Sequence, residues 1–247
     1  MSDGIGPLSE QATSRLEANW QSVVDEVADA ADFFGRPRDS ITIIGVTKYV
    51  DTSLTAGLLN LGCVDLGENR PQGLWQKAEA IAEATDRGPV QPRWHQIGHL
   101  QTNKVRRLLR HRPIIHSVDG QKLLDVIAKE SAAAGVVTRC LLEVNISGDE
   151  SKTGLSAEQV TDCLTKFASP AVRIDGLMAM AGLGSDGDQA ARQFLQVRRL
   201  RDDLQDRLGI SLPTLSMGMS GDFRGAIGAG STMVRIGSRL FEGLIEK

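Results

Sequence analysis

Eight short apolar runs, rich in β-branched residues, recur along the chain and alternate with stretches of helical periodicity. The runs are 41–46, 63–66, 94–100, 114–118, 140–146, 172–180, 214–219 and 233–236. In the intervals, apolar residues recur at helical spacing, as at Leu123, Leu124 and Ile127. Repeated strand–helix units predict a parallel sheet with helical crossovers. Eight units within 247 residues favour a closed (β/α)8 TIM barrel over an open doubly wound sheet.

The first predicted element is a helix that precedes the first strand. Residues 8–34 have an amphipathic pattern, and Ser9 is a candidate N-cap. The apolar stripe consists of Leu16, Trp20, Val23, Val27, Ala31 and Phe34. After the eighth run only residues 238–247 remain, which is too short a stretch for most of a covering helix. We therefore expect the N-terminal helix to cover the seam between the last and first strands, and residues 1–247 to form one domain.

Charge and cysteine content narrow the classes of partner. The net charge of -3 and the pI near 5.8 give no global attraction to nucleic acid or anionic lipid, so a small molecule is the expected partner. The sequence has neither a signal-peptide pattern nor an apolar run of the roughly 20 residues that span a bilayer, which predicts a cytoplasmic protein. Three cysteines without Cys-x-x-Cys spacing favour buried, reduced thiols. His95 and His99 fall on a predicted strand, where their spacing does not predict a metal site.

Lys48 closes the first apolar run, so a buried strand delivers one amine to its own carboxyl-terminal end. A lysine at such a position can simply extend into solvent. A nucleophilic lysine instead needs a lowered pKa, which partial burial beside other cations supplies. The mouth of a barrel offers such an environment, and both interpretations remain open at this point.

Two glycine-punctuated stretches near the end of the chain, 215–222 and 230–237, resemble phosphate-binding loops. Their hydroxyl groups belong to Ser216, Ser220, Ser231 and Thr232. TIM barrels often bind phosphate in the loops after strands seven and eight, beside a short helix that residues 220–227 are predicted to start. Neither stretch matches a Walker A loop or a dinucleotide fingerprint, and ordinary turns are the alternative. An amine and a phosphate cradle on one barrel face are what pyridoxal 5'-phosphate (PLP) requires.

A series of motifs, in order, carries a family resemblance over nearly the whole chain. They occupy residues 45–48, 66–69, 94–104, 116–119, 144–147, 151–154, 176–178 and 215–237. With them the chain resembles the YggS/PROSC family of pyridoxal phosphate homeostasis proteins, whose barrel is similar to the N-terminal domain of alanine racemase. One departure is Arg70-Pro71, where members usually have an aromatic residue and no proline. This departure bears on the packing beside Asn69.

The resemblance implies PLP as the cofactor, bound as a Schiff base on Lys48, with phosphate held around Ser220, Ser231 and Thr232. It also places Arg235 near the cofactor. The full predicted cofactor-binding set is Lys48, Asn69, Met178, Ser216, Met219, Ser220, Ser231, Thr232, Arg235 and Gly237. An arginine can only donate hydrogen bonds, so facing the pyridine nitrogen it would disfavour protonation of the ring. Pairing of Arg235 with a carboxylate or with the phosphate is the alternative.

Three functions compete on this evidence. The first is a PLP-binding protein of vitamin B6 homeostasis, a cytoplasmic monomer without efficient catalysis, with apo-forms of PLP enzymes as possible recipients. The second is a PLP-dependent amino-acid racemase of fold type III, and the third is a barrel isomerase that binds a phosphorylated substrate. By resemblance, alanine racemase adds a β domain and a tyrosine base opposite the lysine. This sequence has Tyr49 as its one tyrosine, directly after Lys48, and ends at Lys247, which favours the first function.

Overall fold

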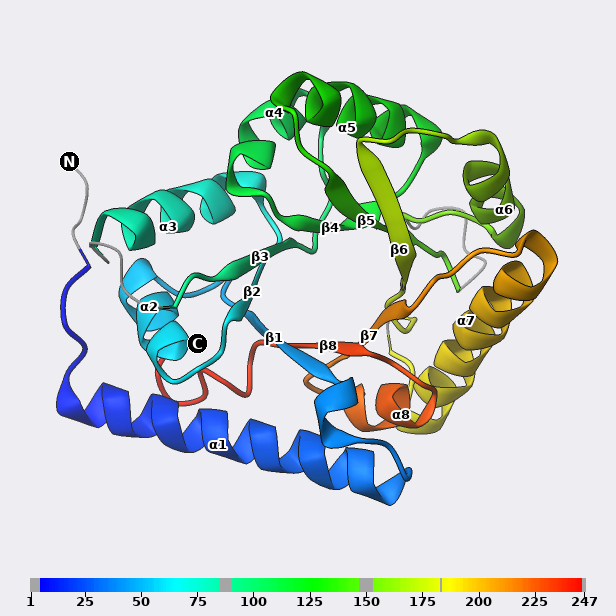
Figure 1. Cartoon of the computed structure of the whole chain (residues 1–247). Coiled ribbons are helices and arrows are strands. Elements are labelled where there is room, and N and C mark those ends of the chain that lie inside the picture. Colours follow the sequence, from blue (N-terminus) through cyan, green and yellow to red (C-terminus); the bar gives the residue numbers. More distant parts are fainter. Residues whose placement is uncertain (1–4, 85–89, 147–152, 183, 246–247) are drawn as a thin grey trace.

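Eight parallel strands close into a barrel in the computed structural model, which describes residues 5–84, 90–146, 153–182 and 184–245 (Figure 1). Each strand pairs with the next along the chain, and β8 closes the barrel on β1. The strands are β1 (Thr42–Val46), β2 (Asp65–Glu68), β3 (Arg93–Gln96), β4 (Ile114–Val118), β5 (Thr138–Glu143), β6 (Val172–Met178), β7 (Thr214–Met219) and β8 (Met233–Ile236). Each of the eight apolar runs therefore overlaps a strand, and the predicted barrel is confirmed.

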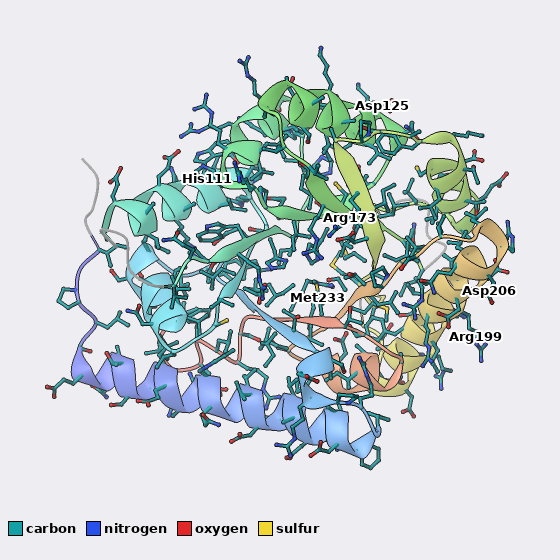
Figure 2. All side chains as sticks on the ribbon, viewed as in Figure 1. His111, Asp125, Arg173, Arg199, Asp206 and Met233 are labelled. Carbon is teal, nitrogen blue, oxygen red and sulfur yellow. The ribbon has the colours of Figure 1, made fainter. Side chains whose placement is uncertain are left out.

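Helices surround this barrel as an outer ring (Figure 1). They are α1 (Glu10–Phe33), α2 (Thr52–Asn60), α3 (Pro71–Ala84), α4 (Val105–Leu108), α5 (Gln121–Ala134), α6 (Ala157–Lys166), α7 (Gly187–Leu208) and α8 (Phe223–Gly228), with short 3-10 turns at Arg38–Ser40, Thr102–Lys104 and Leu109–His111. Figure 2 shows Asp125, Arg199 and Asp206 on the outer helices, away from the barrel interior. None of the helices described is long and apolar enough to cross a membrane.

The helix α1 covers the β8–β1 seam, as predicted. It starts where the Ser9 side chain accepts a hydrogen bond from the Ala12 amide, and it lies between α8 and α2 (Figure 1). Asn19 Nδ2 donates to the carbonyls of Leu240 and Glu242 at 3.1 and 3.0 Å, which ties the segment after β8 to this helix. Residues 237–245 form turns and no helix. The helix α1 thus occupies the place of the eighth outer helix.

Because all strands are parallel, the barrel has one face of carboxyl ends and one of amino ends. The third run was predicted to extend to residue 100, but β3 ends at Gln96. The reason is local: the Gly98 carbonyl accepts from the side chains of Gln96 and Ser117, at 2.9 and 2.6 Å, and not from a backbone amide of the neighbouring strand β4. Chain leaving the carboxyl ends in this way forms the loops in which TIM barrels bind their ligands.

Candidate functional site

Lys48 lies just beyond β1, at the carboxyl face of the barrel. Its side chain is exposed, which agrees with the first of the two interpretations that the sequence left open, and Nζ lies 4.7 Å from the centre of the Tyr49 ring. The backbone before it is held firmly: Lys77 Nζ donates to the Thr47 carbonyl at 2.6 Å and to Glu68 Oε1 at 2.5 Å. This buried ion pair fixes the strand end while the amine of Lys48 extends into the open.

Ser220 and Gly237 meet at the carboxyl ends of β7 and β8. The Gly237 amide donates to Ser220 Oγ at 3.2 Å. The N–H groups of Ser220, Gly221 and Ser238 donate to no residue in the described part of the chain. Successive unpaired N–H groups of this kind form an anion-binding nest. Ser238 was not predicted as a site residue, although a hydroxyl directly after the glycine that follows β8 is a signal that the sequence offers.

Ser231 and Thr232 lie at the opposite, amino-terminal end of β8, so the structure does not bring them to the Lys48 face. The Thr42 amide donates to the Thr232 carbonyl at 2.9 Å. Lys48 is six residues after Thr42 along β1 and beyond its end. At roughly 3.3 Å per residue, this places Lys48 about 20 Å from the level of Thr232. The Ser231 hydroxyl is buried among backbone groups of β7, and Thr232 Oγ1 accepts from the Leu215 amide at 3.0 Å. These hydroxyls fasten β7 to β8, which corrects their prediction as phosphate ligands.

Arg235 points from β8 into the barrel and is 4% exposed. Its Nη1 donates to the carbonyl and hydroxyl oxygens of Ser216 at 2.7 and 2.8 Å, and Nη2 donates to the Ala179 carbonyl at 3.0 Å. Nε has no acceptor, and no carboxylate forms an ion pair with this guanidinium, among residues 5–245 as far as they are described. Burial lowers the pKa of Arg235 to about 10, against the opposing charges of Asp222 and Glu143. The guanidinium stays protonated at neutral pH and has donors left for a ligand.

Ser216 connects Arg235 to two buried histidines that were not predicted as site residues. Ser216 Oγ lies 2.9 Å from His116 Nδ1, and His116 Nε2 lies 2.9 Å from His95 Nδ1. His95 Nε2 in turn lies 2.9 Å from Asp65 Oδ1 on β2. Burial lowers the pKa of both histidines. Each of these residues faces the interior from a different strand, so no local sequence pattern links them.

The remaining predicted residues line the same carboxyl face. Asn69 follows β2, and its carbonyl accepts from Gln96 Nε2 at 3.1 Å. Met178 ends β6 and is fully buried, while Met219 ends β7 and is exposed. Glu143 ends β5, and burial raises its pKa. Of the motif residues, 147, 151 and 152 lie outside the described part of the chain.

Pro71 does not disturb this face, because it is the first residue of α3. Proline is favoured at the first helical position, where its missing N–H is not needed. His95 lies inside the barrel, whereas His99 lies beyond the end of β3, where it is exposed and 3.0 Å from Asp119. Among the described residues, no cluster of three or more His, Cys, Asp or Glu side chains is arranged to hold a metal ion.

Residues 13–244 match the alanine racemase N-terminal domain family. A pyridoxal phosphate homeostasis protein of Aquifex aeolicus is 36% identical over 220 residues, which cover 89% of this chain and 94% of that protein. The chain belongs to the pyridoxal phosphate homeostasis protein family. The family resemblance drawn from the motifs is thus confirmed.

Solved structures of the same size support this assignment. The crystal structure of an unknown protein from Bifidobacterium adolescentis has a TM-score of 0.88 and 31% identity, and covers 96% of this chain and 99% of that one. PipY of Synechococcus elongatus, a structure with PLP bound, has a TM-score of 0.74 and 30% identity, and covers 87% of this chain and 99% of that one. Both matches extend over nearly the whole barrel.

Proposed function

We propose that this protein binds PLP covalently on Lys48 and serves vitamin B6 homeostasis without efficient catalysis. The observation that carries the proposal is the gathering of three unsatisfied groups on one barrel face: the exposed amine of Lys48, the unpaired Nε of Arg235, and the N–H nest beside Ser220. The pyridoxal phosphate homeostasis proteins among the relatives, and the structure of PipY with PLP bound, support the same cofactor.

The residues present fit the chemical parts of PLP. This cofactor supplies an aldehyde that condenses with a primary amine, a phosphate dianion, and a pyridine ring that withdraws electrons when its nitrogen is protonated. Lys48 is the amine, and the nest at Ser220, Gly221 and Ser238 would hold the phosphate. Arg235 would donate from Nε to the ring nitrogen. The ring nitrogen would thus supply the acceptor that this buried N–H group lacks.

Further residues complete the proposed pocket. Gly237 lies against Ser220, Met178 and Met219 provide apolar surface from β6 and β7, and Asn69 follows β2. Ser216 supports Arg235 and does not contact the phosphate in this proposal, because its hydroxyl is engaged with His116. The pocket therefore draws on five of the eight strands: β1, β2, β6, β7 and β8.

Two features argue for binding without efficient catalysis. Arg235 donates and cannot accept, so it would keep the ring nitrogen unprotonated and the ring a poor electron sink. General acid–base chemistry on both faces of a substrate needs two positioned groups, and losing one costs about 10²–10⁴-fold in rate. Tyr49 lies against the Lys48 amine itself, so it does not supply a group on the opposite face.

We also propose that the protein delivers its cofactor to apo-forms of PLP enzymes, as a cytoplasmic monomer that binds neither nucleic acid nor membranes. The exposure of Lys48 supports this part, because an amine that reaches out of the mouth is accessible to another protein. The net charge of -3 gives no global attraction to nucleic acid or anionic lipid.

Reduction of the PLP-loaded protein with borohydride, followed by peptide mass analysis, tests the proposal. The cofactor should be fixed on Lys48, and Lys48→Ala should abolish the label. Lys104→Ala removes another lysine near the same face and should leave the label intact. A label on any peptide without Lys48 would refute the proposed attachment. Incubation of the loaded protein with L-amino acids should give no racemisation or decarboxylation at about 1 s⁻¹ or faster, the range of ordinary enzymes.

A further inference from the structure

A continuous chain of hydrogen bonds crosses the barrel core between a buried cation and a buried anion. It runs from Arg235 through Ser216, His116 and His95 to Asp65. Its contacts measure 2.8, 2.9, 2.9 and 2.9 Å, and all five residues are buried. We call these five residues the core chain. Arg93, from the amino end of β3, closes it with two bonds to the Asp65 carboxylate at 2.8 and 2.6 Å.

The donors in the core chain can be assigned from its two ends. The Asp65 carboxylate only accepts, so His95 must carry its proton on Nε2. A neutral His95 then has a bare Nδ1, which accepts from His116 Nε2–H. His116 Nδ1 is likewise bare and accepts from the Ser216 hydroxyl, whose oxygen accepts from Arg235. Every bond thus points from Arg235 towards Asp65, and no proton is left over.

The opposite direction is disfavoured on electrostatic grounds. His95 would then need a second proton, because Nε2 must still donate to Asp65 while Nδ1 donates to His116. Burial lowers the pKa of both histidines, and Arg93, Arg139 and Arg235 act in the same direction on one ring or the other. The Asp65 carboxylate raises the pKa of His95, but the lowering by burial is the larger effect. Two neutral rings with protons on Nε2 are the arrangement that satisfies every group.

We propose that Asp65, His95, His116 and Ser216 are positioning residues that set the orientation of the Arg235 guanidinium through this one-way chain. The Ser216 hydroxyl donates its proton to His116, so its oxygen is left to accept from Arg235. The Ser216 carbonyl oxygen accepts from the same Nη1. Two acceptors on one residue hold Nη1, and this leaves Nε as the free donor. The inference rests on the proposed function in that the cofactor ring is the group that Arg235 meets.

Nitrogen NMR of the histidine rings in the cofactor-free protein tests the core chain without any cofactor. Between pH 6 and 8, His95 and His116 should each show a protonated Nε2 and a bare Nδ1 that do not titrate. A ring of either residue with its proton on Nδ1, or with two protons, would overturn the assignment. Since Lys48 labelling is a separate measurement, failure of this inference is distinguishable from failure of the proposed function.

A substitution series tests the effect on Arg235. Ser216→Ala cuts the link to His116, and Ser117→Ala is its control, because Ser117 is another buried strand serine, whose hydroxyl donates to the Gly98 carbonyl at 2.6 Å. In Ser216→Ala, PLP should dissociate about tenfold faster and its absorption band should shift, while borohydride still labels Lys48. Ser216→Thr keeps the hydroxyl and should restore both properties in part. Equal dissociation rates and equal spectra in Ser216→Ala and Ser117→Ala would refute the proposal.

Discussion

The two ends of the barrel differ in how their polar groups are satisfied. At the amino-terminal end, the buried carboxylate of Asp65 pairs with Arg93, and that of Asp175 pairs with Arg139 and Arg173 (Figure 2 labels Arg173 on β6). At the carboxyl end, the amine of Lys48 and the Nε of Arg235 have no hydrogen-bond acceptor among the described residues. Paired groups hold a structure together, whereas unpaired donors are available to a ligand.

Replacing the unpaired cation should give the largest effect. In Arg235→Met, the dissociation constant for PLP should rise about 10- to 150-fold, because one charge-assisted bond from Nε to the ring is worth roughly 1.5–3 kcal/mol. The unfolding free energy of the cofactor-free protein should fall because three buried bonds to Ser216 and Ala179 are lost, and removal of a buried charge without an ion-pair partner should offset part of that loss. Absorbance titration and urea unfolding measure the two quantities. Arg173→Met, at the paired end, is the control for binding, and equal losses of affinity in both variants would contradict the contrast between the ends.

Acid should lower the unfolding free energy through the two buried histidines of the core chain, His95 and His116. His95 and His116 have pKa values lowered by burial, so the unfolded chain binds more protons than the folded one below about pH 6.5. Stability is therefore full above this pH and is lost as the pH falls, by up to about 1.4 kcal/mol per histidine per pH unit. Urea unfolding at pH 7.5, 6.5 and 5.5 measures the loss. His99→Gln, at an exposed histidine, should leave the slope unchanged, and a flat profile in the unsubstituted protein would mean that the two rings are not buried as neutral groups.

Ser220→Ala changes the open end by one hydroxyl. PLP affinity should fall about tenfold or more, as expected for one lost bond to a charged group. The unfolding free energy should hardly change, because among the described residues Ser220 Oγ accepts one bond, from the Gly237 amide, in a partly exposed loop. Unchanged cofactor dissociation would place the phosphate elsewhere.

Ser231→Ala should lower stability and leave PLP affinity unchanged, the opposite pattern to Ser220→Ala. Its effect on affinity should be the smallest of the series. The Ser231 hydroxyl is buried at the paired end, where it accepts from the Met217 amide at 3.2 Å. Loss of that acceptor should lower the unfolding free energy by about 1–2 kcal/mol and leave PLP affinity unchanged. Thermal unfolding and the same titration measure both quantities. A loss of affinity comparable to that of Ser220→Ala would restore Ser231 to the phosphate site.

Ser220 and Ser231 lie at opposite ends of the barrel, and the comparison shows what the sequence can predict. Both lie in glycine-punctuated stretches beside a short helix, and composition does not distinguish them. Ser220 follows β7 and Ser231 precedes β8, so strand direction sends them to opposite faces. The strand runs, the N-terminal helix and the position of Lys48 at a strand end were predictable, because they depend on local periodicity.

The core chain was not predictable in the same way. His116 and Ser216 are 100 residues apart, and only closure of the barrel brings their side chains within 2.9 Å. The exposure of Lys48 was one of two interpretations that the sequence left open, and only the folded structure decides between them. Local patterns thus predicted which residues end strands, while barrel closure determined which polar groups remain unpaired.

The helix α1 also has a consequence for the order in which the barrel folds. Its Asn19 and Arg15 bind carbonyls at Leu240 and Glu242, more than 220 positions later in the chain. Contacts of such large sequence separation are slow to form, because the chain must close a long loop before they stabilise it. On a ribosome, α2 follows α1 closely, but α8 and the segment after β8 emerge much later, so the part of the apolar stripe that faces α8 stays uncovered until translation is nearly complete. Closure of the β8–β1 seam is therefore expected to be a late step of folding, and the apolar stripe of α1 is the surface at risk of aggregation until then.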